Sequence, residues 1–105
     1  MFNADEIMQL RKSYIEIGKL VQQYGYGQYD SVLKILMRQI HCIDSDSDED
    51  EKKQYLVDSY KSIFSSPRGL GDFIIYDTDL EKRKMLNEKF CEETKHIWNI
   101  MKPYI

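Results

Sequence analysis

The chain has 105 residues, of which 42% are hydrophobic and 31% are charged, as expected for a soluble globular protein. This length predicts one domain covering residues 1–105 and excludes two separate hydrophobic cores. The formal net charge is −3 and the lysines are scattered, which argues against direct nucleic-acid binding, because that function requires a basic stripe or patch.

The first predicted element is an amphipathic helix over residues 4–24. Its apolar side chains recur three or four residues apart, namely at Ile7, Leu10, Tyr14, Ile17, Val21 and Tyr24. Asn3 lies just before this stretch and Glu6 follows three residues later, which indicates a capping box with Asn in place of Ser or Thr. Gly25 and Gly27 then predict a break in the helix.

The next two predicted helices flank an acidic segment. The second helix begins after an N-cap at Asp30 or Ser31 and ends at His41, with Lys34, Arg38 and Gln39 facing outward. Its inward residues are Tyr29 or Val32, followed by Leu33, Leu36, Met37, Ile40 and Ile43. The third helix covers residues 49–64 and ends at Ser65-Ser66-Pro67. Its inward residues are Tyr55, Leu56, Tyr60, Ile63 and Phe64.

The segment between these helices, Asp44 to Glu51, contains six carboxylates and no apolar residue. It carries a charge of −6 against −3 for the whole chain, which leaves +3 for all other residues. Burial of an unpaired carboxylate costs several kcal/mol. We therefore expect a solvated loop, a metal site or a surface for a basic partner, and its acidic end suits the first turn of the third helix.

Residues 73–76 are four bulky apolar or aromatic residues for which no partner strand is evident. Because a lone strand leaves its backbone groups unpaired, we expect an apolar turn or short helix packed into the core. A capping box at residues 78–81 then predicts a fourth helix that ends near Met101. Its inward residues are Leu80, Leu86, Phe90, Ile97, Trp98 and Met101. The predicted fold is all-α, a compact bundle of about four helices with an acidic loop between the second and third.

The sequence contains no complete metal or cofactor motif. Asp44, Asp46 and Asp48 match the first ligand positions of a helix-loop-helix calcium loop, but Glu49 and Tyr55 occupy the positions that require Gly and Glu. A calcium loop that starts at Asp46 fails in the same way. The cysteines are far apart and the Cys–His spacings do not match a zinc module, so we expect reduced and mostly buried thiols.

The sequence also contains no motif of an enzyme active site. Gly69-Leu70-Gly71 lacks the third glycine and the Lys-Ser or Lys-Thr ending of a nucleotide-binding loop, and therefore predicts a tight turn. We expect a protein without catalytic activity and without a cofactor.

One part of the sequence resembles a group of small helical bacterial proteins. The resemblance comprises Tyr24-Gly25 after an amphipathic helix, a second helix, and a segment from Ser65 to Asp79 in which Gly69-Leu70-Gly71-Asp72 precedes Phe73-Ile74-Ile75. In that group a glycine-containing loop leads into an Asp and an apolar triplet before the last helix. Some members are immunity proteins of contact-dependent growth inhibition and other polymorphic toxin systems. The resemblance covers about two thirds of the chain and implies a toxin-binding role without catalytic residues.

The leading hypothesis is an immunity protein that binds a cognate bacterial toxin, a cytoplasmic nuclease, and blocks its basic active-site surface. The expected partner-binding residues are Asp44, Asp46, Asp48, Glu49 and Asp50, with Tyr26, Tyr29 and Tyr55 as flanking anchors. The alternative is a non-enzymatic adaptor or regulatory protein that acts through a tyrosine-bearing helical face. Such a protein could act as a monomer or as a homodimer. The sequence has no apolar run long enough to span a membrane and no signal peptide, so we expect a cytoplasmic protein without membrane contact.

Overall fold

The computed structural model describes residues 2–46, 48–65, 70 and 73–105. These residues form four α-helices and no β-strand, which confirms the predicted all-α fold. The helices are α1 (Ala4–Tyr24), α2 (Asp30–Asp44), α3 (Glu49–Ser65) and α4 (Leu80–Met101), and a short 3-10 helix, η2 (Lys102–Tyr104), follows α4. The molecule is elongated, with extents of 45 × 24 × 22 Å.

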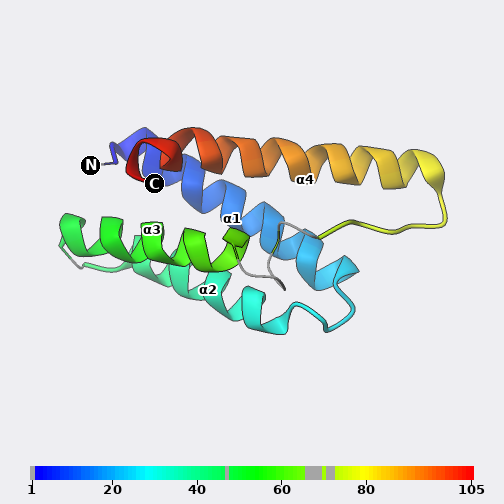
Figure 1. Cartoon of the computed structure of the whole chain (residues 1–105), viewed down its shortest axis with the longest axis horizontal. Coiled ribbons are helices and arrows are strands. Elements are labelled where there is room, and N and C mark those ends of the chain that lie inside the picture. Colours follow the sequence, from blue (N-terminus) through cyan, green and yellow to red (C-terminus); the bar gives the residue numbers. More distant parts are fainter. Residues whose placement is uncertain (1, 47, 66–69, 71–72) are drawn as a thin grey trace.

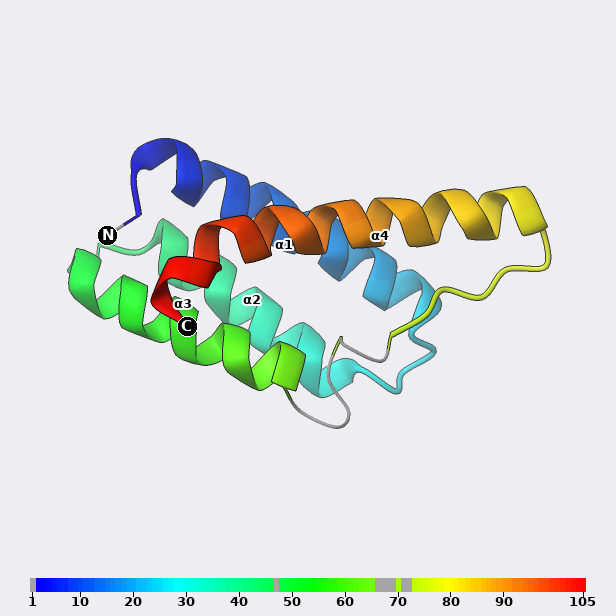
Figure 2. The ribbon, with the colours of Figure 1, turned by 45° about the horizontal axis from the view of Figure 1, so that its top comes forward.

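Helix α1 is the centre of the bundle. It packs against α4 on one side and α2 on the other, while α3 packs against α2 (Figures 1 and 2). The predicted stripe of α1 is buried except for Ile7, which is half-buried, and Ser13 and Leu20 are buried in addition. The buried face is therefore wide enough to contact two neighbouring helices.

Both ends of α1 match the prediction. The Glu6 backbone N–H donates to Asn3 Oδ1 over 2.8 Å, and the Asn3 N–H donates to Glu6 Oε1 over 3.0 Å, which completes the capping box. At the other end, a Cβ atom on Gly25 would clash with the Val21 carbonyl oxygen. The chain then turns through left-handed backbone at Tyr26 (φ 51°) and Gly27 (φ 79°). Glycine accordingly ends α1 for a steric reason as well as a conformational one.

The predicted ends of α2 and α4 require correction. Helix α2 continues to Asp44 rather than stopping at His41, because this extra turn buries Ile43 in the core. Its N-cap is Tyr29 and has no side-chain cap bond, so neither Asp30 nor Ser31 caps it. For α4, the capping box predicted at residues 78–81 would make Thr78 the N-cap. The N-cap is instead Asp79, whose Oδ1 accepts from two backbone N–H groups of the first turn.

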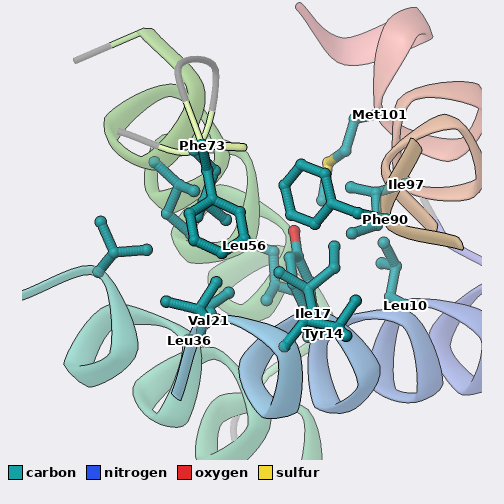
Figure 3. Packing of buried hydrophobic residues seen from close by; sticks show 14 of the residues in the cluster. Leu10, Tyr14, Ile17, Val21, Leu36, Leu56, Phe73, Phe90, Ile97 and Met101 are labelled. Atoms are coloured by element: carbon teal, nitrogen blue, oxygen red, sulfur yellow. The ribbon is translucent and has the colours of Figure 1, made fainter. Parts of the chain in front are cut away.

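The core is formed where the apolar faces of all four helices meet. Figure 3 shows Leu10, Tyr14, Ile17 and Val21 of α1 packed among Leu36, Leu56, Phe73, Phe90, Ile97 and Met101. Tyr14 is fully buried, and burial raises the pKa of its hydroxyl, with the neighbouring Gln39 side chain opposing this shift. Gln39 is itself fully buried, so its predicted outward position is wrong.

Some residues that were expected to face inward are exposed. The exposed fractions are 39% for Tyr55, 46% for Trp98, 60% for Met37 and 74% for Leu80. Leu80 is exposed because the first turns of α4 extend beyond the other helices (Figures 1 and 2). Trp98 lies at the edge of the core, where its ring stacks on Tyr60 of α3 with centroids 6.4 Å apart.

Helix α3 ends at Ser65, one residue beyond the predicted Phe64. Ser66 and Pro67 of the predicted stop, and the predicted turn at Gly69 and Gly71, lie outside the described residues. Leu70, between the two glycines, is described and is buried in the core.

Candidate functional site

The acidic segment Asp44 to Glu51 forms one end of the molecule, where the α2–α3 connection lies. Asp44 is the last residue of α2, Asp46 and Asp48 lie in the connection, and Glu49 begins α3. The segment is therefore divided between two helix ends and a short link. The expectation that part of it starts the third helix is confirmed, and these carboxylates are favourable beside the positive end of the α3 dipole.

Asp44 differs from the other acidic residues because it pairs with a residue of α1. Arg11 Nε donates to Asp44 Oδ1 over 2.9 Å, and Arg11 Nη2 donates to Oδ2 over 3.1 Å. This hydrogen-bonded guanidinium lowers the pKa of the Asp44 carboxyl and has its own pKa raised. Asp44 thus joins the end of α2 to α1, and its charge is compensated within the chain.

The other expected contacts of the acidic segment, Asp46, Asp48, Glu49 and Asp50, are all exposed. None of them forms an ion pair with another described residue. Lys52 follows Glu51 on α3 and is turned toward α2. Its Nζ donates to the Ile43 carbonyl oxygen over 3.2 Å. Its ammonium group therefore caps the C-terminus of α2 and forms no ion pair with a described residue of the acidic segment.

Of the three tyrosines that were expected to flank the acidic segment, Tyr55 lies beside it and Tyr26 and Tyr29 do not. Tyr55 lies one turn after Glu51 on α3 and borders a shallow hollow between α2 and α3. Tyr26 and Tyr29 precede α2, whereas the acidic segment follows it, and a helix of this length spans about 22 Å. These two residues therefore do not flank the acidic segment. Tyr29 instead packs edge-on against Phe73, with ring centroids 5.1 Å apart.

The tyrosine-bearing helical face of the alternative hypothesis is also not formed. The exposed tyrosines are Tyr26, Tyr55 and Tyr76, which belong to a turn, to α3 and to the segment before α4. The remaining tyrosines are buried or half-buried. An adaptor function would consequently need a different surface.

The two cysteines are free thiols in different environments. Cys42 on α2 is half-buried, and burial raises the pKa of its thiol, which makes it less reactive than an exposed thiol. Cys91 on α4 is exposed, so its expected burial is wrong. Within the described residues, no group of three or more His, Cys, Asp and Glu side chains could hold a metal ion.

A partly buried polar cluster lies between α1 and α4. Gln9 Nε2 donates to Ser13 Oγ over 2.9 Å and lies 3.3 Å from His96 Nδ1, while Glu93 Oε2 lies 3.8 Å from the same ring nitrogen. Ser13 and Glu93 are buried, and Glu93 Oε2 has no hydrogen-bond partner among the described residues. This cluster contributes polar contacts to the interface between α1 and α4, and its His96 side chain is 39% exposed.

Residues 73–77, which connect to α4, are neither a turn nor a short helix, so that prediction is wrong. They run as an extended segment with alternating burial: Phe73 and Ile75 are in the core, whereas Ile74 and Tyr76 are 68% and 63% exposed. Figure 1 shows this segment drawn out before α4. The alternation is typical of a strand that is buried on one face.

A side chain of α4 takes the place of the missing partner strand. The Ile75 N–H donates to Asn87 Oδ1 and Asn87 Nδ2 donates to the Ile75 carbonyl oxygen, each over 2.9 Å. Asn87 Nδ2 also donates to the Arg83 carbonyl oxygen, which fixes the amide in place. Asn87 was not among the residues predicted from the sequence, although a carboxamide carries an N–H donor and a C=O acceptor side by side, as a peptide group does.

Comparisons with family models, with curated proteins and with solved structures find no match to this chain. None of the described helices has the length and apolar character that crossing a membrane requires.

Proposed function

We propose that this chain is a non-enzymatic immunity protein that binds a basic toxin in the cytoplasm, a nuclease, and covers the surface with which that toxin binds nucleic acid. The observation that carries the proposal is the free acidic end of the molecule. Asp46, Asp48, Glu49 and Asp50 are exposed there, and no described cation pairs with them.

The physical argument starts from the toxin. A protein that cleaves nucleic acid must present lysine and arginine to phosphate groups. A cluster of carboxylates on a helix end is attracted to the same surface and accelerates the encounter. Because the residues outside the acidic segment carry +3 in total, the attraction has to come from this one end.

The test compares two variants that lose the same charge at different places. One carries Asp46→Asn, Asp48→Asn and Asp50→Asn, in which Asn at position 48 still suits a helix start. The other carries Glu81→Gln, Glu88→Gln and Glu92→Gln, all exposed residues of α4. Some immunity proteins of the resembled group are encoded beside their toxins, so the binding partner for the test is the purified product of the gene adjacent to this one. Its binding to each variant is measured in a surface-based kinetic assay at low and at physiological salt.

We expect the acidic-end variant to lower the association rate constant by about tenfold or more at low salt, with a smaller loss at higher salt because the charges are screened. The α4 variant should stay within about twofold of the original chain on the same grounds. Equal losses in the two variants, or no loss in either, would contradict binding through the acidic end.

A further inference from the structure

The extended segment 73–77 has two edges, and only one of them is occupied. The N–H and C=O groups of Ile75 both bond to Asn87 on α4. In an extended chain, the backbone groups of the residues on either side point the opposite way. The N–H and C=O groups of Ile74 and Tyr76 therefore point away from Asn87, and they form no hydrogen bond with any described residue.

The side chains beside this open edge are apolar and exposed. Ile74 and Tyr76 point outward from the core on the same face of the segment. Arg83 covers one face of the Tyr76 ring, with its guanidinium carbon 4.6 Å from the ring centroid. An exposed strand edge with apolar side chains can pair with another strand. Folded proteins usually prevent this pairing by placing charged side chains on the edge or by covering it.

We propose that this edge pairs with the same segment of a second copy of the chain, forming a two-stranded antiparallel ladder across a two-fold axis. The axis passes beside Ile75 and places Ile74 of each copy opposite Tyr76 of the other. All four outward backbone groups of each copy then find partners. The side-chain pairs, a β-branched residue beside an aromatic one, are favourable across antiparallel strands.

The charges around the segment favour a second copy over a strongly charged partner. Between residues 73 and 84 three carboxylates, at Asp77, Asp79 and Glu81, balance the three cations Lys82, Arg83 and Lys84. Lys82 Nζ lies 3.8 Å from Asp77 Oδ2 within the chain. The charges of residues 73–84 therefore cancel within each copy at this contact, and a two-fold contact closes on itself instead of growing into a fibre. This surface is separate from the acidic end, so the inference does not depend on the proposed function.

The first experiment measures the mass of the full chain by sedimentation equilibrium over a range of concentrations. We expect the weight-average mass to rise toward twice that of the monomer. Ile74→Lys with Tyr76→Lys should weaken dimerisation by at least about tenfold, because both symmetric pairs become like-charge pairs. Ile74→Glu with Tyr76→Glu should do the same, and an equimolar mixture of the two variants should restore the dimer.

The second experiment tests the register of the pairing. The chain with Ile74→Lys and Tyr76→Glu carries opposite charges at the two positions that face each other across the axis. It should dimerise alone, whereas a pairing of like residues would place Lys opposite Lys. Circular dichroism of every variant checks the helical fold, which should be unchanged because both replaced side chains are exposed.

Three results would overturn the inference. The original chain could remain monomeric up to about 1 mM, a concentration at which even a dimer with a Kd of about 1 mM would be detected. It could dimerise with an affinity that the Lys or Glu replacements leave unchanged. The oppositely charged variants could also fail to associate when mixed although each is folded.

Discussion

At the scale of single residues, the pairing of Arg11 with Asp44 predicts a pH-dependent stability. Because the pKa of Asp44 is lowered in the folded protein, its stabilising effect is present above the ordinary value of 3.8 and is lost as the pH falls through the lowered value. We expect Asp44→Asn to melt at a lower temperature than the original chain at pH 7. The two melting temperatures should converge at a pH below this lowered pKa, where the carboxyl is protonated.

The matched control for this experiment is Asp46→Asn, which removes a carboxylate two residues away that has no ion-pair partner among the described residues. Its melting temperature should follow the original chain at both pH values. If the two variants were to behave alike at pH 7, the contribution of the Arg11 pair would be refuted.

Gln39 shows why single residues on a helix face are hard to assign. It lies three residues after Leu36 and four before Ile43, both of which are buried, so its position belongs to the inward face of α2. Its predicted outward position rested on the usual exposure of amide side chains. Neither polar atom of its amide has a hydrogen-bond partner among the described residues.

At the scale of elements, Asn87 determines how the extended segment lies on α4. Replacing it by Ala removes both hydrogen bonds to Ile75 and leaves that peptide unpaired at the edge of the core. We expect Asn87→Ala to lower the free energy of unfolding by about 1–3 kcal/mol, measured by urea denaturation.

Asn99 provides the control for Asn87, because it is an exposed asparagine on the same helix. Asn99→Ala should change the free energy of unfolding by no more than about 0.5 kcal/mol, as is usual for surface positions. An equal effect of the two replacements would argue against a specific role of Asn87.

At the scale of the whole molecule, the arrangement of the helices predicts unequal protection of their backbone amides. Helix α1 packs between α2 and α4, whereas the first turns of α4 extend beyond the bundle (Figure 2). Hydrogen exchange measured by mass spectrometry should therefore be slowest in residues 10–21. Among the described helices, exchange should be fastest in residues 80–86. Equal exchange in these two segments would contradict this view of the packing.

The positions of the two proposed contact surfaces also follow from the arrangement of the whole molecule. The acidic end lies at the α2–α3 connection, and the start of α4 lies at the other end of the long axis (Figure 1). The two proposed contacts, with a basic partner and with a second copy, consequently use separate surfaces.

The sequence by itself determined the helices, because the signals for them are local. The apolar spacing of α1, its capping box and the glycines that follow lie within a few residues of the backbone that they control. The acidic character of the α2–α3 connection was equally evident from composition.

The tertiary structure decided which of these residues are paired within the chain, which are buried and which are exposed. Asp44 meets Arg11 across 33 residues of chain, and Ile75 meets Asn87 across 12. No spacing rule predicts such contacts, because they depend on how α1, α2 and α4 pack against one another. For that physical reason the paired carboxylate, the buried Gln39 and the open edge of residues 73–77 became visible only in the folded chain.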